Sequence, residues 1–324
     1  MQYRRVGQTG LKISLFSLGS WVTFGKQIHL DDAKVLLKEA YDAGVNFFDN
    51  AEGYEAGASE EIMGSAIKGL GLDRSSFIVS SKVFWGGDKP TQLGLSAKHV
   101  RDACDAALIR LKVDYLDLYY CHRPDPETPI LETVRIMNQL IQQGKILYWG
   151  TSEWSAKQIT EAHRVAQQYN LIGPSVEQPQ YNMLFRDRVD NEYSSLYQNV
   201  GMGLTTYSPL CSGILTGKYL DGVPDDSRLN LPGYEWLREM LLSEQGLKNQ
   251  ESLKKLQPIA HELDISLANL AIIWCAKNKN VSSVILGASK LSQLQSNLRA
   301  VTDYDKVTDE IMGNINQILD TSVQ

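Results

Sequence analysis

The sequence has few of the features that mark a secreted or membrane-spanning protein. Its four cysteines, Cys104, Cys121, Cys211 and Cys275, form no CxxC pair, which in a long chain is typical of reduced thiols in a cytosolic protein. The N-terminus lacks the apolar core of a signal peptide. The most apolar run, Leu267–Ala276, is about half as long as a membrane span. We therefore expect a cytoplasmic protein.

The chain also lacks a net positive charge and has few histidines. The formal net charge is -6, which argues against a protein whose main role is to bind nucleic acid. An anionic cofactor can still bind, because its site needs only local positive charge. The chain has five histidines without partner ligands at useful spacing, so we predict no metal site.

The composition is otherwise that of an ordinary globular protein. Hydrophobic residues make up 43% of the chain and charged residues 22%, enough to bury a substantial core. A length of 324 residues exceeds the usual size of one domain, but eightfold α/β barrels run past about 250 residues as single domains. No linker, repeat or low-complexity tract divides the sequence, so we expect one domain over residues 1–324.

Short apolar strands alternate with amphipathic helical segments along most of the chain. This alternation predicts parallel strands joined by crossover helices, and eight such units favour a closed barrel. The expected strands are Leu15–Gly19, Val45–Asn50, Phe77–Lys82, Tyr115–Cys121, Ile146–Thr151, Ser175–Gln180, Gly203–Thr206 and Val284–Gly287. The expected helices include Asp31–Ala43, Ser96–Leu111, Pro129–Gln143, Ser155–Tyr169 and Arg188–Asn199. The predicted fold class is therefore α/β, a (β/α)8 TIM barrel.

Further segments are expected around this barrel. A hairpin opens the chain, with strands Tyr3–Val6 and Leu11–Ser14. Residues 208–250 are rich in Gly, Pro, Asp and Ser, and a segment of that length predicts a functional loop or one with small elements of its own. Extra C-terminal helices are expected at about Ser252–Glu262, Leu267–Lys277 and Lys306–Leu319.

Two helices carry recognisable start signals. Thr128 precedes Pro129, which predicts a capping threonine followed by proline at the first helical position. Ser155 and Gln158 have the spacing of a capping box.

Four polar residues fall at the carboxyl ends of successive predicted strands, where barrels of this kind place their active sites. Asp49 ends one strand with Tyr54 in the following loop, Lys82 ends the next strand, and His122 follows the third. A phenol titrates near 10, too high for an efficient proton donor near neutral pH, and a nearby ammonium should lower that pKa. We therefore expect Asp49 to hold Lys82, Lys82 to lower the pKa of Tyr54, and His122 to orient a substrate oxygen. Singly, each residue is more often a helix cap, a packing group or a solvated charge.

The same four residues resemble the catalytic tetrad of the aldo-keto reductase superfamily, in which Asp, Tyr, Lys and His occur in this order. The similarity covers nearly the whole chain. Specific resemblance to the branch that contains the β-subunits of voltage-gated potassium channels and their bacterial relatives lies in KVFWGGDKPTQLGLS, RPDPETPILETV, YWGTSEWS, LTGKY and SSVILGASKLSQLQSN. Unlike many channel subunits, which carry Asn and Trp there, this chain has His122 and Tyr207, as ordinary reductases do.

The resemblance implies an NADP(H) site that needs no GxGxxG motif, and none is present. Ser152 and Gln178 would hold the nicotinamide carboxamide, and Tyr207 would stack on its ring. The remaining implied cofactor contacts are Trp21, Ser208, Pro209, Leu210, Ser212, Gly213, Lys218, Arg228, Gly287, Ser289, Gln293 and Asn297. As alternatives, Ser152 or Ser289 could simply cap local backbone, and Arg228 could be a surface charge.

Three functions are compatible with these residues. The first is NADPH-dependent reduction of an aldehyde or ketone, with Tyr54 as general acid and Trp21, Trp85, Tyr54 and His122 forming the substrate pocket; Phe84 either joins them or packs outside. The second is a regulatory protein that holds NADPH and reports redox state to a membrane partner. The third, a metal-dependent hydrolase, would need more ligands than His122. The family branch also implies a homotetramer or higher homo-oligomer.

Overall fold

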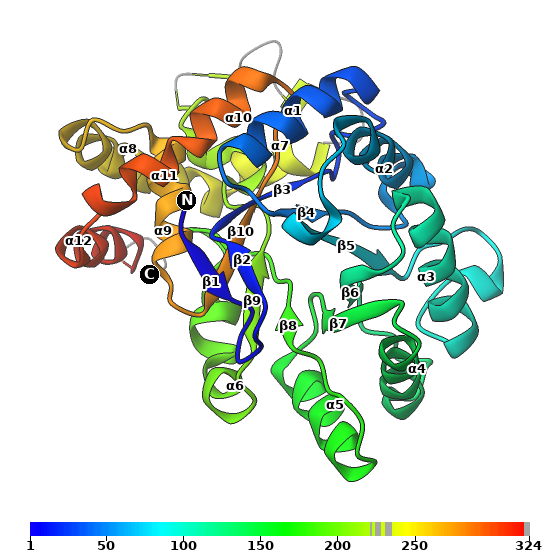
Figure 1. Cartoon of the computed structure of the whole chain (residues 1–324). Coiled ribbons are helices and arrows are strands. Elements are labelled where there is room, and N and C mark those ends of the chain that lie inside the picture. Colours follow the sequence, from blue (N-terminus) through cyan, green and yellow to red (C-terminus); the bar gives the residue numbers. More distant parts are fainter. Residues whose placement is uncertain (221, 224–227, 231–234, 321–324) are drawn as a thin grey trace.

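The computed structural model describes residues 1–220, 222–223, 228–230 and 235–320. Within them, eight parallel strands close into a barrel in the order β10-β3-β4-β5-β6-β7-β8-β9 (Figure 1). The strands are β3 (Phe16–Gly19), β4 (Phe47–Asp49), β5 (Ile78–Val83), β6 (Leu116–Cys121), β7 (Ile146–Thr151), β8 (Val176–Glu177), β9 (Gly203–Thr206) and β10 (Val281–Leu286). The predicted (β/α)8 barrel is confirmed.

Five of the eight strands differ in length from the sequence-based prediction, β8 most of all. The predicted strand Ser175–Gln180 shortens to β8, only Val176–Glu177, because Pro174 and Pro179 bracket it and proline cannot donate to a strand ladder. The last strand begins three residues earlier than predicted, at Val281, where it pairs with Leu204 of β9.

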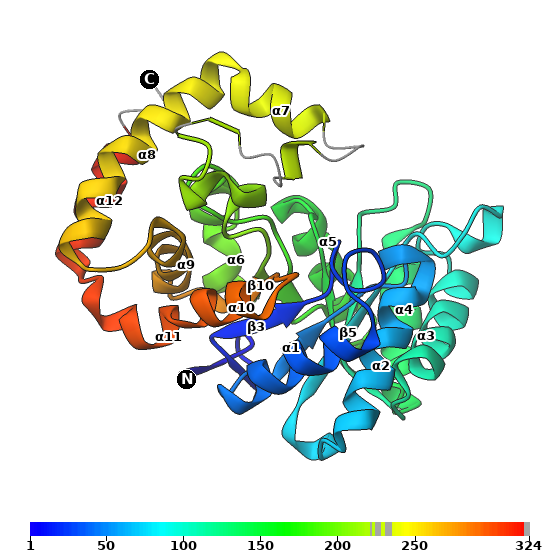
Figure 2. The ribbon, with the colours of Figure 1, turned by 90° about the horizontal axis from the view of Figure 1, so that it is seen from above.

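Helices surround the barrel on its outside (Figures 1 and 2). Those that follow the strands in turn are α1 (Leu30–Asp42), α2 (Ala58–Leu70), α3 (Ala97–Leu111), α4 (Ile130–Gln142), α5 (Ala156–Gln168), α6 (Ser194–Asn199) and α10 (Leu291–Leu298). The additional ones are α7 (Glu235–Leu242), α8 (Glu244–Glu262), α9 (Leu267–Lys277), α11 (Ala300–Asp303) and α12 (Asp309–Asp320). Short 3-10 turns span Tyr54–Gly57, Arg74–Ser76, Pro90–Gln92, Cys211–Thr216, Arg228–Asn230 and Tyr304–Lys306, and one π-helical turn spans Arg188–Glu192.

Of three local predictions, one is wrong. The segment 208–250 carries small elements of its own, one of the two predicted alternatives: α7 and the first residues of α8 lie within it, and Leu237 and Leu241 bury one face of α7. Thr128 does not cap α4: its hydroxyl donates instead to Asp125, and Pro129 takes the capping position. The capping box at the start of α5 is confirmed, since the Ser155 hydroxyl accepts from the backbone N–H of Gln158.

The N-terminal hairpin closes one end of the barrel. It consists of β1 (Tyr3–Arg5) and β2 (Lys12–Ser14), which pair antiparallel. Val6 and Ile13 are fully buried and pack in one cluster with interior barrel residues, among them Phe47 and Ile78, the first residues of β4 and β5. The amino-terminal end is thereby sealed with apolar side chains, which leaves the carboxyl-terminal end for a site.

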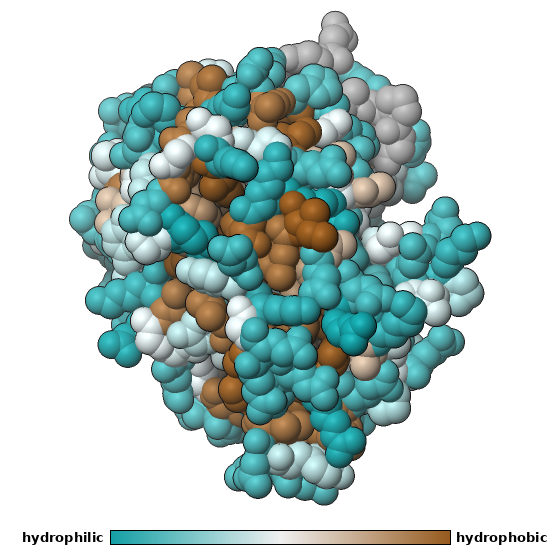
Figure 3. All heavy atoms as spheres, turned by 45° about the vertical axis from the view of Figure 1, so that its right-hand side comes forward, coloured by the Kyte–Doolittle hydropathy of each residue, from teal (hydrophilic) through white to brown (hydrophobic). Residues whose placement is uncertain are grey.

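The outer surface is largely hydrophilic on the face over α2, α3 and α4, with hydrophobic side chains showing between the polar ones (Figure 3). Among the described residues no single helix is long and apolar enough to cross a membrane; α8 and α9 meet that test only as a pair, bent by 92° at their junction.

Candidate active site

A buried ion pair lies at the carboxyl ends of β4 and β5. These neighbouring parallel strands place Asp49 and Lys82 side by side, with Nζ of Lys82 2.6 Å from Oδ2 of Asp49. The Lys82 ammonium also donates to the backbone oxygen of Asn50 at 2.8 Å and to the hydroxyl oxygen of Tyr54 at 3.0 Å. All three ammonium protons thus have acceptors, which a fully buried lysine requires. The sequence predicted this contact between Asp49 and Lys82.

Further donors fix the Asp49 carboxylate. The Ser80 hydroxyl donates to its Oδ1 at 2.7 Å, and the side-chain amide of Gln178 donates to the same oxygen at 3.1 Å. Gln178 was expected only as a cofactor contact. In the structure it also ties the ion pair to β8, on the other side of the barrel.

The protonation behaviour of Lys82 agrees with the expectation, and that of Tyr54 differs from it. Burial opposes the Lys82 charge, but Asp49 and Tyr54 outweigh it and raise the pKa of Lys82, so the ammonium persists. The prediction that Lys82 would lower the pKa of Tyr54 below its ordinary value is wrong in net direction. Burial raises the pKa of Tyr54 more than Lys82 lowers it, so the phenol stays protonated near neutral pH.

His122 faces Tyr54 from the end of β6. Their rings are in an edge arrangement with centroids 5.7 Å apart, and the Trp85 ring lies 4.9 Å from that of His122. Burial, together with the charges of Lys82 and Arg123, holds the pKa of His122 well below its usual range. His122 is therefore a neutral imidazole with one N–H, and its buried Nδ1 has no hydrogen-bond partner among the described residues.

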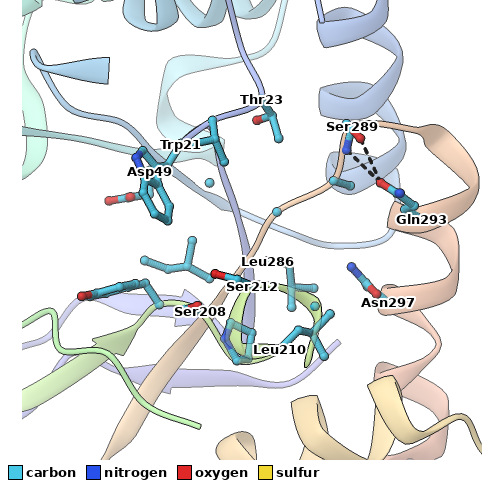
Figure 4. A pocket seen from close by; sticks show the side chains of 18 of the residues that line it. Trp21, Thr23, Asp49, Ser208, Leu210, Ser212, Leu286, Ser289, Gln293 and Asn297 are labelled. Atoms are coloured by element: carbon cyan, nitrogen blue, oxygen red, sulfur yellow. Dashed lines mark hydrogen bonds between the residues drawn. The ribbon is translucent and has the colours of Figure 1, made fainter. Parts of the chain in front are cut away.

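A pocket of about 1000 Å³ opens above these groups and runs to α10 (Figure 4). Trp21 and Asp49 lie on one side of it, Ser208, Leu210 and Ser212 line another, and Ser289, Gln293 and Asn297 lie at its far end. This volume is at the upper end of the range for small-molecule sites.

The pocket collects nearly all of the residues predicted for the site. The lining members of that set are Trp21, Asp49, Tyr54, Trp85, His122, Ser152, Gln178, Tyr207, Ser208, Pro209, Leu210, Ser212, Gly213, Lys218, Gly287, Ser289, Gln293 and Asn297. Lys82 lies beneath the lining, fully buried. The side chain of Arg228 lies outside the part of the chain that the structure describes. Phe84 is not in the lining; it packs edge-on against Trp85, 4.9 Å between centroids.

Hydrogen bonds fix several lining side chains in place. The Ser152 hydroxyl donates to the backbone oxygen of Gln178 at 2.8 Å. The Tyr207 hydroxyl donates to Glu153 at 3.0 Å. At the far end, the backbone N–H and hydroxyl of Ser289 both lie within hydrogen-bonding distance of Oε1 of Gln293, at 3.0 and 3.2 Å (Figure 4). These contacts preset the side chains before a ligand arrives.

Backbone strain is concentrated in the loops around the pocket. Non-glycine residues with positive φ follow β3, β4, β7 and β9, at Val22, Glu55, Ala56, Glu153, Ser208, Cys211 and Ser212. Gly213 has φ +96, and a Cβ there would lie 3.1 Å from the end of Lys218. Strained conformations persist where the surroundings enforce them, commonly at functional sites.

The pocket is positively charged although the chain is acidic. Arg123, Lys218 and Lys290 line it, whereas Asp49 is the only acidic residue among the described lining residues and is paired with Lys82. Arg123 and Lys290 were not predicted as site residues. A signal existed for both: Arg123 directly follows His122, and Lys290 directly follows Ser289. No group of three His, Cys, Asp or Glu side chains within the described ranges is arranged to hold a metal ion.

Comparison with known proteins gives a consistent result. The model of the Aldo/keto reductase family matches residues 16–320 of the chain. A protein of Arabidopsis thaliana named "Probable voltage-gated potassium channel subunit beta" is 52% identical over 320 residues, 98% of this chain and 97% of that protein. A protein of the same name from Oryza sativa subsp. japonica is 51% identical over 320 residues, with the same coverage.

Proposed function

The chain belongs to the aldo/keto reductase family, and from that membership we propose that it reduces aldehydes or ketones to alcohols with NADPH, using Tyr54 as general acid. The family resemblance seen in the sequence is confirmed by the match over residues 16–320. The observation that carries the proposed mechanism is the direction of one hydrogen bond: Lys82 donates to the oxygen of Tyr54, so the phenolic proton is left to donate elsewhere.

The surroundings of Tyr54 suit it to donate a proton to a carbonyl oxygen that is being reduced. With its pKa raised by burial, Tyr54 holds its proton until a substrate oxygen develops negative charge. The Lys82 ammonium, 3.0 Å from the phenol oxygen, stabilises the phenolate left after transfer. Asp49 keeps that ammonium charged and in place. His122, neutral and edge-on to Tyr54, supplies an N–H that orients the same substrate oxygen.

The pocket fits a dinucleotide in size and in charge. Three cations lie along a cavity in which the only described acid is neutralised, which suits the phosphates of NADP(H). Ser152, Gln178 and Tyr207 would hold the nicotinamide end, and Ser289, Gln293 and Asn297 the adenosine end. When bound there, the reduced nicotinamide supplies the hydride. Trp21 and Trp85, 47% and 42% exposed at the mouth, would form apolar walls for the substrate.

The test is NADPH oxidation by purified protein with 4-nitrobenzaldehyde and methylglyoxal, in wild type and Tyr54→Phe. Loss of the proton donor should lower kcat/KM by about 10² to 10⁴ while the affinity for NADPH, followed by its fluorescence, stays the same. Wild-type turnover that survives in Tyr54→Phe would refute the role of Tyr54. The absence of any wild-type turnover would refute the reductase proposal.

A second function is supported by the names of the relatives. Both are named as probable channel β-subunits and are similar over 98% of this chain. On that ground the alternative is a homo-oligomeric regulatory protein that holds NADPH and signals redox state to a membrane partner. Cofactor that copurifies but neither exchanges nor turns over, together with capture of a tetrameric membrane partner, would favour it. His122 favours catalysis.

A further inference from the structure

Arg123 occupies a place in the pocket that neither the tetrad nor the cofactor contacts explain. It follows β6 directly after His122 and lines the cavity. Its Nη1 donates to the backbone oxygen of His122 at 2.5 Å and to the Ser152 hydroxyl at 3.3 Å. Its guanidinium carbon lies 5.4 Å from the centroid of the Trp85 ring. These contacts hold the guanidinium group at the end of the pocket that contains the proton donor.

The charge of Arg123 has no acidic partner among the described residues. Arg74 and Arg110, also partly buried, do have one, Asp117 and Glu60, each at 2.6 Å. Arg4 has no acidic partner among the described residues either, but both of its Nη atoms donate to protein oxygens. Both hydrogen bonds that Arg123 makes to described residues use Nη1, so its remaining N–H donors have no partner within the described ranges. A partly buried guanidinium with free donors is suited to a planar oxyanion, which it binds in a bidentate manner.

The field of this cation reaches the reacting groups. Arg123 contributes to lowering the pKa of His122, and it opposes the rise in the pKa of both Tyr54 and Tyr207. An anion bound by Arg123 would therefore lie close to the carbonyl that Tyr54 protonates.

We propose, on the basis of the reductase function above, that Arg123 recognises an oxyanion on the substrate, so that the preferred substrates are aldehydes or ketones that also carry a carboxylate or phosphate. Trp85 forms the adjoining wall, in edge contact with the His122 ring. Neutral aldehydes enter the same pocket without this contact.

The experiment compares isosteric substrates that differ in charge. The carboxylate of 4-carboxybenzaldehyde and the nitro group of 4-nitrobenzaldehyde have the same shape, and the difference in their intrinsic reactivity cancels when variants are compared with wild type. Arg123→Gln should lower kcat/KM about ten- to a hundredfold more for the acid than for the nitro compound, the effect of losing a hydrogen bond to a charged group. Arg123→Lys, which retains the charge, should keep part of the preference.

Arg135 offers a matched control. Its guanidinium also lies over an aromatic ring, 5.1 Å from the centroid of Tyr169, but it is exposed on α4, away from the pocket. Arg135→Gln should leave the ratio of acid to nitro compound unchanged. D-Glyceraldehyde 3-phosphate and D-glyceraldehyde form a second pair, which shows whether phosphate or carboxylate is the better anion.

Binding is measured separately from turnover. Calorimetric titration with 4-(hydroxymethyl)benzoate and with 4-nitrobenzyl alcohol should show tighter binding of the acid in wild type, and this difference should vanish in Arg123→Gln. If both aldehydes lose the same factor in Arg123→Gln, Arg123 only positions Ser152 and His122, and the proposal is overturned. If no aldehyde is reduced, the reductase function fails, and the calorimetry still decides whether Arg123 binds the anion.

Discussion

Replacing Lys82 with methionine tests the buried ion pair directly. The substitution keeps a side chain of similar length but removes the ammonium, leaving Asp49, 3% exposed, with only the hydroxyl of Ser80 and the amide of Gln178. Removing one partner of a buried pair costs about 3–5 kcal/mol because the other charge stays buried without compensation.

The expected fall in the melting temperature follows from the size of the chain. An unfolding entropy of about 2 cal/mol/K per residue, applied to 324 residues, gives about 0.7 kcal/mol/K. A loss of about 3–5 kcal/mol therefore lowers Tm by about 4–7 °C. The double variant Lys82→Met/Asp49→Asn buries no uncompensated charge, so its Tm should lie above that of either single variant.

The assay is thermal unfolding at neutral pH of wild type, both single variants and the double variant, together with NADPH oxidation. Turnover should be lost in Lys82→Met and in the double variant, because Tyr54 no longer has an ammonium beside its oxygen. It should fall in Asp49→Asn, which removes the carboxylate that keeps the ammonium charged and in place. If the Tm losses of the single variants simply add in the double variant, the pair is not coupled and this reasoning is refuted. Full turnover in Lys82→Met would refute the role of Lys82 in stabilising the phenolate.

The remaining predictions concern pH and a purely structural ion pair. Because burial raises the pKa of Tyr54 and lowers that of His122, kcat/KM for reduction should be flat from pH 7 to 9; a falling limb in that range would contradict both assignments. Burial raises the pKa of Glu177 to about 8, so the folded state retains a proton that the unfolded state loses near 4.5; stability should fall as pH rises between these values. Glu177→Gln should therefore raise Tm at pH 8 but not at pH 4.5, and an equal shift at both would count against this. Arg110→Met leaves Glu60 buried and unpaired, so unfolding should become easier by about 3–5 kcal/mol while kcat/KM is unchanged; lost turnover in the folded variant would implicate this pair in the site.

Much of the fold follows from periodicity alone. Strand and helix segments alternate along the chain, and the predicted strand Ile146–Thr151 agrees with β7 at both ends. The short β8 was overestimated because the predicted strand ran on to Gln180, whereas the paired part ends at Glu177, ahead of Pro179, which cannot donate to a strand ladder. Helix α7 was missed because its one-sided burial, at Leu237 and Leu241, depends on the elements it packs against.

The positions of the tetrad could be predicted for a topological reason. In a parallel barrel all carboxyl ends of the strands meet at one mouth, so Asp49, Lys82 and His122 had to come together once their strands were identified. Tyr54 follows β4 closely enough to be brought to the same mouth. Sequence order and strand ends therefore determined which residues meet.

Only the tertiary structure decided how these groups behave. The sequence indicates that Lys82 lies near Tyr54, but burial raises the pKa of the phenol by more than the ammonium lowers it. The link from Gln178 to Asp49 joins residues 129 positions apart, and the charge of Arg123, which has no acidic partner among the described residues, depends on which carboxylates the fold places elsewhere. Desolvation and charge pairing depend on every neighbour in space, whereas strand order depends on local pattern; the sequence therefore determined where the site lies, and the packing determined its chemistry.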